Sequence, residues 1–495
     1  MEKQIELEQI KQKKDGSIAK DSLILTVSKV ISSLIGLVVT MLLSRYRSLY
    51  EYGTYVQLLL VINLLDNAIM LGLPNSISFF LGRAETEEKR KKFLSVYFTL
   101  NTILTLVSGL ILVTLIYPIQ IYFKNDGIHG FWYFLLLYPF AYVTSSSIEN
   151  ICVSTKRTGL LIPYRITHSV VIFTLVLVAS LTHLDFSVYL LIFVLTEVIF
   201  AVSVILISRK IVGGIHVSLD KKLIKAILKF SIPLGIATAV ATLNAEIDKF
   251  VIGFFGSTED VAIYANCAKD LPLTILTAGI TASILPRLSL LFKNGKGKEA
   301  VGIWSNAVLV SISIVSVFAI GLLFFSKDAI SLLYSDKYLP GDNIFKVFCL
   351  VIVLKAVYWG TILNCSGHTK FIFYSSIISL SCNLVLNVPF YFLFGIFGCA
   401  VSTLLTTLVM NIVQLCWTCR ITKVKFYEIL PWSKIGLVLL FNITLGVFFS
   451  RVADLIPLEQ YIGSILESIF LGAIWMVLYL AVVFPTLLRK IKSRG

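Results

Sequence analysis

The chain of 495 residues is too apolar for a soluble protein: 57% of its residues are hydrophobic, 14% are charged, and the mean hydropathy is +0.88. Soluble proteins carry about 25% charged residues. In a soluble protein the net charge of +15 would indicate nucleic acid binding. Here we interpret the basic residues as loop charges that orient membrane helices, and we expect no nucleic acid partner.

Apolar runs of about 20 residues follow one another along the chain and predict an all-α polytopic membrane protein. They indicate about fourteen transmembrane spans, near 23–43, 54–80, 93–117, 131–153, 163–183, 187–207, 231–255, 262–288, 303–325, 343–365, 369–393, 396–418, 433–453 and 461–487. The N-terminal segment, 1–22, is polar and lacks the basic start and cleavage site of a signal peptide. We therefore expect the first span to be retained.

The spans predict an N-terminal six-helix bundle at 23–207, a basic linker at 208–230, a C-terminal six-helix bundle at 231–420, helices 13 and 14 at 433–487, and a tail at 488–495. Most of the 43 lysines and arginines fall in segments on the same side as the N-terminus, among them Lys91, Lys222 and Lys423. Since cytoplasmic loops are enriched in Lys and Arg, we expect both termini, the linker and the tail to be cytoplasmic.

The two halves share a sequence pattern. "SLYEYGTY" at 48–55 and "STEDVAIY" at 257–264 are 209 residues apart, and each opens the second span of its half. Each second span then reaches a proline near its inner end, Pro74 in one half and Pro286 in the other. Because six spans return the chain to its starting side, the two halves have the same orientation. This is the parallel repeat found in transporters.

Ionisable residues inside the predicted spans are costly and therefore point to function. Among them are Lys29, Asp66, Glu149, Glu197, Glu246, Asp248, Lys249, Asp270 and Lys355. Because both halves contribute, we expect a shared water-filled cavity, to which the polar stripes containing Asn63, Asn150 and Asn383 also belong. Stripes of Ser, Thr and Gly alone are more typical of helix–helix contacts.

The stretch "ATLNAEIDKFVIGFF" at 241–255 concentrates three of these charges. Asn244 and Asp248 share one helix face, which we expect to line the cavity. Glu246 and Lys249 are three residues apart on another face, close enough to form a buried ion pair. The alternative is that all three charges belong to a buried network without a transport role.

Four longer stretches resemble the polysaccharide repeat-unit (Wzx-like) flippases of the multidrug/oligosaccharidyl-lipid/polysaccharide exporter superfamily. They are "SLYEYGTYVQLLLVINLL", "IDKFVIGFFGSTEDVAIYANCAKDLPL", "LLYSDKYLPGDNIFKVF" and "GHTKFIFYSSIISLSCNLVLNVPFYFLFGIFGCAVSTLL". The resemblance implies two six-helix bundles in a V around a central cavity, with two extra C-terminal helices that form a groove for a lipid tail in relatives. It also implies alternating-access export of undecaprenyl-diphosphate-linked oligosaccharide across the bacterial cytoplasmic membrane. Its partners would be membrane lipid and the polymerase and chain-length proteins of a surface-polysaccharide pathway.

The diphosphate of such a substrate needs cations, and its sugars need hydrogen-bonding side chains. Lys29, Lys249, Lys269 and Lys355 are the diphosphate candidates, and Arg165 is placed to guard the cytoplasmic entrance. The full substrate-binding set is Lys29, Asn63, Asp66, Glu149, Asn150, Arg165, Asn244, Lys249, Lys269, Lys355 and Asn383. For coupling to H⁺ or Na⁺ the candidates are Asp66, Asp248 and Asp270.

Two other functions remain open at this point. One is a cation-coupled multidrug exporter of the same superfamily, and the other is a membrane-embedded polysaccharide polymerase or ligase. The short outer loops and five scattered histidines disfavour an enzyme, and His168 is better explained by packing or hydrogen bonding than by catalysis. We expect no catalytic residues, no metal or redox site at Cys416 and Cys419, and no cofactor.

Overall fold

The computed structural model describes residues 27–269, 271, 273–456 and 463–492, and this part of the chain is helical without strands. Eleven helices in it are long and apolar enough to cross a membrane. They are Val27–Tyr46, α2 (Leu49–Met70), α4 (Glu87–Thr114), α7 (Leu161–Leu181, preceded by η3, Thr158–Leu160), α8 (Phe186–Ile211), α9 (Lys221–Phe255), α12 (Gly297–Phe324), α16 (Thr369–Phe394), α17 (Ile396–Thr422), α18 (Trp432–Leu455) and α20 (Ser464–Lys492). The protein is therefore a multi-pass, all-helical membrane protein.

Three predicted spans are not among these eleven, each for a local reason. The span at 131–153 is α6 (Trp132–Ser154), a continuous helix that contains Pro139, Glu149 and Asn150. The span at 262–288 is divided into α10 (Thr258–Cys267) and α11 (Leu273–Lys293). The span at 343–365 is divided into α14 (Asp342–Leu354) and α15 (Thr361–Cys365). The number fourteen therefore remains a prediction.

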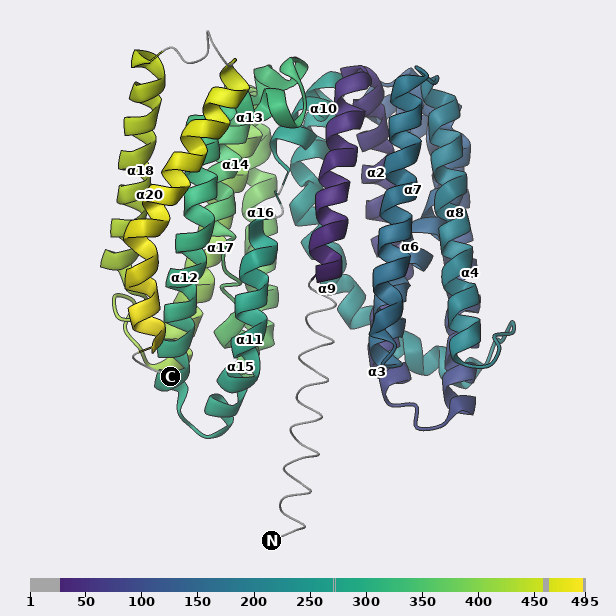
Figure 1. Cartoon of the computed structure of the whole chain (residues 1–495). Coiled ribbons are helices and arrows are strands. Elements are labelled where there is room, and N and C mark those ends of the chain that lie inside the picture. The colour runs from purple at the N-terminus through teal and green to yellow at the C-terminus, as the bar shows by residue number, and fades with distance from the viewer. Residues whose placement is uncertain (1–26, 270, 272, 457–462, 493–495) are drawn as a thin grey trace. The chain divides into compact units, whose positions relative to one another are not determined.

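The chain forms two compact units, Met1–Leu243 and Asn244–Gly495. In the first, α6 packs against α4 and α8, and α2 packs against both α4 and α6 (Figure 1). Polar side chains join these helices inside the unit: Asn101 Nδ2 on α4 donates to Thr144 Oγ1 on α6 at 2.7 Å. Outward-facing apolar side chains such as Leu181 are exposed. Since a bilayer solvates apolar surface, this inside-polar, outside-apolar arrangement suits a membrane.

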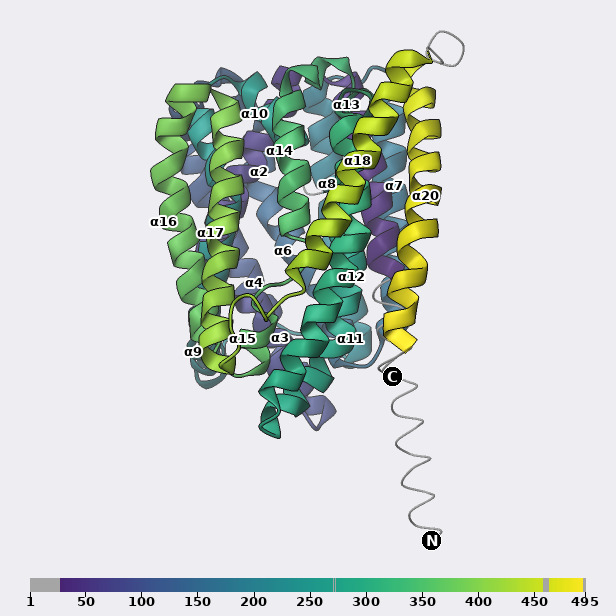
Figure 2. The same ribbon diagram turned by 90° about the vertical axis from the view of Figure 1, so that its left-hand side faces the viewer.

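In the second unit, α16 and α17 run side by side, and α18 and α20 pack on α12 (Figure 2). Phe449 of α18 and Trp475 of α20 stack inside an apolar cluster that includes Val317 and Ile320 of α12. Asn442 Nδ2 of α18 also donates to Ser316 Oγ of α12 at 3.0 Å, in a buried position. The two last helices are therefore an integral part of the second unit.

The order of elements repeats along the chain. Four consecutive helices of the first unit begin at residues 87, 116, 126 and 132: α4, α5 (Ile116–Phe123), η2 (Asp126–Phe131) and α6. Each has a counterpart that begins 210 residues later, at 297, 326, 336 and 342: α12, α13 (Ser326–Leu333), η4 (Asp336–Gly341) and α14. Ser48 and Ser257, which start the matching sequence stretches, both cap a helix. Each forms a reciprocal capping box with the acid three residues on. The sequence match therefore reflects an equivalent helix start.

A close backbone contact holds the first half of α9 against the end of α2 in the first unit. Gly72 has φ +71°, a left-handed conformation, between α2 and η1 (Leu73–Asn75), which leads into α3 (Ser76–Gly82). A Cβ added at Gly235 of α9 would lie 2.2 Å from the carbonyl carbon of Leu71. Only glycine allows this approach.

Candidate functional site

Three helices of the first unit bring a charged cluster together around Glu149. Lys29 of the first helix places its Nζ 2.7 Å from Glu149 Oε1, and Arg165 of α7 places its Nη2 2.5 Å from Glu149 Oε2. Arg165 Nη1 also donates to Ser28 Oγ at 2.8 Å. Two cations thus share one carboxylate, and the cluster keeps a net positive charge.

The two cations of this cluster differ in access. The Lys29 side chain is 51% exposed, whereas the Arg165 side chain is only 17% exposed. Arg165 is also held from two sides, by Glu149 and Ser28, and its planar guanidinium suits such fixed contacts. Lys29 is therefore the cation better placed to meet a ligand, while Arg165 and Glu149 position it.

The other predicted site residues of the first unit have different surroundings. Asn150 Nδ2 lies 3.5 Å from the Pro74 carbonyl oxygen, and Ser78 Oγ lies 3.4 Å from Asn150 Oδ1, so Asn150 faces η1 and α3. Asn63 of α2 is half-buried.

Asp66 is 3% exposed and accepts a hydrogen bond from Ser108 Oγ of α4 at 2.6 Å. Its Oδ2 is buried without a hydrogen-bond partner in the described part of the chain.

Asp248 is the centre of a buried polar network in the second unit. It is 4% exposed and accepts hydrogen bonds from three neutral side chains on three other helices. Tyr264 Oη of α10 donates to Asp248 Oδ2 at 2.6 Å, and Asn387 Nδ2 of α16 donates to Oδ1 at 2.8 Å. Thr403 Oγ1 of α17 also donates to Oδ2. One carboxylate thus links α9, α10, α16 and α17.

The network continues through α16. Asn387 Nδ2 also donates to Asn383 Oδ1 at 2.8 Å, and Ser402 Oγ of α17 donates to the same oxygen at 3.0 Å. Asn383 Nδ2 lies 3.3 Å from the Asn244 carbonyl oxygen. Asn244 and Asn383, predicted as cavity residues, are therefore members of the Asp248 network.

The oxygen atoms of this network are suitable ligands for a small hard cation. Asp248 supplies a carboxylate, Asn383 and Asn387 supply amide oxygens, and Thr403 supplies a hydroxyl oxygen, the ligand types that hard cations prefer. Asn387 Oδ1 is buried and has no hydrogen-bond partner among the described residues. A buried acceptor without a donor is costly. A cation or a proton bound beside Asp248 would satisfy the local excess of oxygen atoms.

The remaining candidates lie elsewhere in the second unit. Lys249 Nζ is 2.5 Å from Glu246 Oε2, so this pair carries no net charge. Lys269 follows α10, Lys355 follows α14, and both are exposed. Asp270 lies outside the described residues.

Several side chains that complete these clusters were not predicted as site residues. They are Ser28, Ser108, Tyr264, Asn387 and Thr403. Asn387 and Thr403 lie on polar stripes of the predicted spans at 369–393 and 396–418, so helical periodicity carried a signal for them. Tyr264 of α10 lies outside the predicted polar stripes, so helical periodicity carried no signal for it.

Comparison with known proteins identifies relatives over much of the chain. The profile of the family described as "Polysaccharide biosynthesis protein" matches residues 18–292, more than half of the chain. The probable low-salt glycan biosynthesis flippase Agl15 of Haloferax volcanii is 22% identical over 203 residues, which cover 40% of this chain and 43% of that protein. The uncharacterized membrane protein MJ1068 of Methanocaldococcus jannaschii is 24% identical over 251 residues, 50% of this chain and 49% of that protein. The chain thus spans less than half the length of both relatives.

Solved structures share the fold at low sequence identity. The lipid II flippase MurJ in its inward closed conformation has a TM-score of 0.71 at 16% identity, covering 93% of this chain and all of that one. An inward-facing multidrug resistance MATE family transporter of the MOP superfamily has a TM-score of 0.60 at 12% identity. The match covers 81% of this chain and 98% of that transporter. The chain therefore shares the fold of these two transporters, as the sequence predicted. Together with the profile match, this shows that the chain belongs to the polysaccharide biosynthesis protein family.

Proposed function

We propose that the protein is a flippase that moves undecaprenyl-diphosphate-linked oligosaccharide from the cytoplasmic to the outer leaflet by alternating access. The observation that carries this proposal is the net positive cluster of Lys29, Arg165 and Glu149 on membrane helices. A cation kept at such a position needs a functional reason, and an anionic head group supplies one. The family match and the glycan flippase among the relatives support the same class of substrate.

The cluster offers a simple mechanism for holding the diphosphate. Without substrate, Glu149 neutralises part of the charge and keeps both cations in place. The exposed Lys29 ammonium then turns to a phosphate oxygen, while Arg165 stays on Glu149 and Ser28. Charge-assisted hydrogen bonds to phosphate are stronger than neutral ones, so this exchange favours the bound head group. Asn63 and Asn150 are proposed to contact the sugar.

Asp248 is the proposed coupling group, with Asp66 and Asp270 as further candidates. Binding of H⁺ or Na⁺ can drive alternating access only if it favours one conformation over another. A cation at Asp248 would hold together the four helices that contribute its network. Its release would leave an anion with only neutral donors, and these helices would be freer to rearrange.

The proposed location is the bacterial cytoplasmic membrane with both termini in the cytoplasm, beside the polymerase and chain-length proteins of the same pathway. In a cysteine-free background, a single cysteine at position 222 should react only with reagents that reach the cytoplasm, and one at position 124 only with external reagents. Reaction of the position-222 cysteine with an external, membrane-impermeant reagent would reverse this orientation.

A multidrug exporter is the second candidate, because MATE transporters share the fold. The charge of the cluster separates the two functions. A site with two cations and one carboxylate repels the cationic compounds that an acidic site would attract, and it favours an anion. We also propose that the protein is a transporter and has no enzymatic activity.

Flipping can be measured in proteoliposomes that contain lipid-linked oligosaccharide labelled on its sugar. Lys29→Gln should reduce the initial rate about tenfold or more, since it removes a charged hydrogen bond to phosphate while leaving a polar side chain only one atom shorter. Lys210→Gln, an exposed charge at the end of α8, is the matched control and should flip as the parent does. A Lys29→Gln protein that inserts normally and flips at the parent rate would exclude the cluster from substrate binding.

A further inference from the structure

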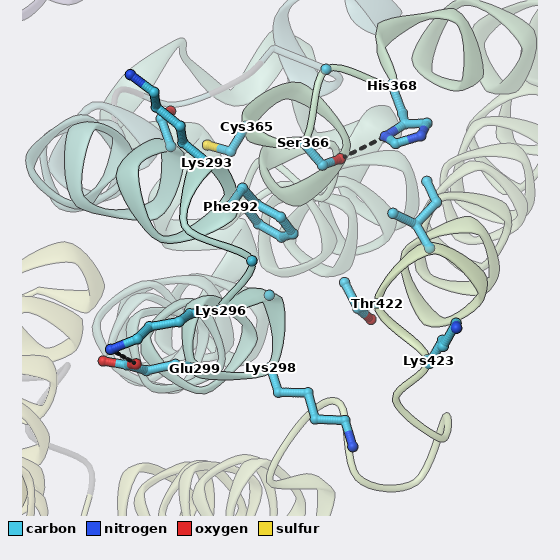
Figure 3. A pocket seen from close by; sticks show the side chains of 15 residues that line it. Phe292, Lys293, Lys296, Lys298, Glu299, Cys365, Ser366, His368, Thr422 and Lys423 are labelled. Carbon is cyan, nitrogen blue, oxygen red and sulfur yellow. Dashed lines mark hydrogen bonds and ion pairs between the residues drawn. The ribbon is translucent and has the colours of Figure 1, made fainter.

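A basic pocket lies at one end of the second unit, apart from the Asp248 network. Three segments form its wall: 289–299, where α11 turns into α12; 365–368, where α15 leads into α16; and 421–423, at the end of α17 (Figure 3). Its volume is about 950 Å³. Pockets that bind small molecules measure about 300–1,000 Å³, so this one is large enough for a ligand of many atoms.

The charge of the pocket is strongly one-sided. Its lining includes Lys293, Lys296, Lys298, Lys423 and a single acid, which is Glu299. Glu299 lies 3.8 Å from Lys296 Nζ, and Lys296 is turned towards it in Figure 3. Such a concave surface lined by one sign of charge concentrates ions of the opposite sign.

Lys298 and Lys423 are the two cations best placed to meet a ligand. They come from different segments, the start of α12 and the end of α17, and extend on the same side of the pocket (Figure 3). Neither makes an ion pair or a hydrogen bond through its side chain with the residues that the structure describes. Two lysines without a carboxylate partner, brought together by the fold, form a site for an anion.

The backbone adds to this preference. The first turn of α12, at Gly297, Lys298 and Glu299, lines the pocket, and no side chain caps its N–H groups. Uncapped N–H groups at the start of a long helix carry a partial positive charge and favour phosphate. His368 lines the opposite wall, where its Nδ1 lies 3.1 Å from Ser366 Oγ.

We propose that this pocket binds a phosphate-bearing anion through Lys298, Lys423 and the first turn of α12. The phosphate belongs either to the head group of an anionic membrane phospholipid or to a soluble phosphorylated molecule. Phe292 and Ile421 line the same pocket and would contact the less polar part of either ligand. The site is independent of the proposed flippase activity, since it contains none of the residues assigned to the oligosaccharide or to coupling.

The test compares the purified full-length protein with a Lys298→Gln/Lys423→Gln variant and a Lys221→Gln/Lys222→Gln control, which removes two exposed lysines at the start of α9. The lipid arm uses nanodiscs of phosphatidylcholine with a minor fraction of phosphatidylglycerol and counts the anionic lipids retained by native mass spectrometry. The soluble arm measures binding of glycerol 1-phosphate by calorimetry in detergent.

We expect the parent and the control to bind the anion in one arm, which identifies its source, and the pocket variant to bind about tenfold more weakly. Thermal unfolding of the variant at the parent's temperature would show that the loss is not due to misfolding. Equal weakening in the pocket variant and the control would reduce the effect to general surface charge and overturn the proposal. Absence of binding by the parent in both arms would overturn it as well.

Discussion

Replacing Asp248 by asparagine tests whether its network binds a cation. Asn keeps the shape of the side chain, removes the negative charge, and changes one acceptor oxygen into an NH₂ donor. Tyr264 and Thr403 both donate to Oδ2, so the amide oxygen of the variant should occupy that position. The new NH₂ group then faces Asn387 Nδ2, which donates to Oδ1 in the parent.

This donor–donor contact cannot be relieved by a simple flip of the Asn387 amide. Nδ2 of Asn387 also donates to Asn383 Oδ1, so a flip would place two acceptor oxygens against each other. One buried hydrogen bond is therefore lost, which costs about 1–3 kcal/mol of the free energy of unfolding. This loss is independent of any ion and sets the baseline against which an ion effect is read.

The ion effect is measured as thermal stability in detergent while NaCl replaces choline chloride at constant ionic strength. A site for Na⁺ in the folded protein stabilises by about 2.7 kcal/mol when Na⁺ is at 100 times its Kd. We expect this rise in the parent and its loss in Asp248→Asn. The control Tyr264→Phe removes one hydrogen bond but keeps the charge, so it should be less stable and still respond.

A parent response that Asp248→Asn retains in full would refute the assignment of the ion to this network. If the parent gains no stability from Na⁺, the same titration is repeated in pH. A proton-coupled parent should then show a pH dependence of stability that Asp248→Asn lacks. A parent that differs from the variant in neither titration would exclude Asp248 as the coupling group.

Two further predictions concern the first unit. Gly235→Ala should lower the free energy of unfolding by about 1–3 kcal/mol, because its Cβ would collide with the backbone after α2. The control is Gly436→Ala, whose added Cβ has no atom within 4 Å. Equal melting temperatures of the two variants would contradict the contact. Outside the membrane spans, a hydrogen bond from Lys92, 2.6 Å away, lowers the pKa of Asp220. The ion pair should therefore stabilise the protein above the unfolded-state pKa of about 3.9, and this stability should be lost as the pH falls through the lower folded-state pKa. The difference in stability between the parent and Asp220→Asn should then disappear in acid. A difference that persists in acid would refute the pairing.

Much of the fold could be predicted from the sequence, because a helix that crosses a bilayer needs about 20 apolar residues and few other patterns supply them. The predicted spans at 163–183 and 187–207 correspond to α7 and α8 within a few residues. The interruptions after α10 and α14 escaped prediction, since hydropathy averaged over a span does not detect a break in helical hydrogen bonding.

The sequence could indicate candidate residues for the site, but not the contacts between them. The cost of charge in a membrane made Lys29, Glu149 and Asp248 candidates for a functional site. Which of them meet depends on how helices pack, and helical periodicity describes each helix alone. Asp248 and Asn387 are 139 residues apart in the chain and 2.8 Å apart in space, and nothing in either helix predicts that contact.

The internal repeat keeps the helices of the two halves but not the charges of the two clusters. The scaffold recurs at an offset of 209 or 210 residues, down to the capping boxes of α2 and α10. The charges of the two clusters do not recur: Thr238 and Trp359 stand where Lys29 and Glu149 would repeat, and Val39 stands where Asp248 would. The repeat thus keeps its helix starts, while the two units carry different polar clusters.

This difference agrees with the proposal that the Lys29 cluster holds the diphosphate of the substrate and the Asp248 network holds a cation. Lys29→Gln and Asp248→Asn should then affect different steps, because their side chains belong to different clusters that share no partner among the described residues. Changes at independent sites add, whereas changes within one network do not. Lys29→Gln should therefore reduce substrate binding, and Asp248→Asn should abolish the ion response. Any dependence of one effect on the other would arise from the conformational change that couples the two clusters.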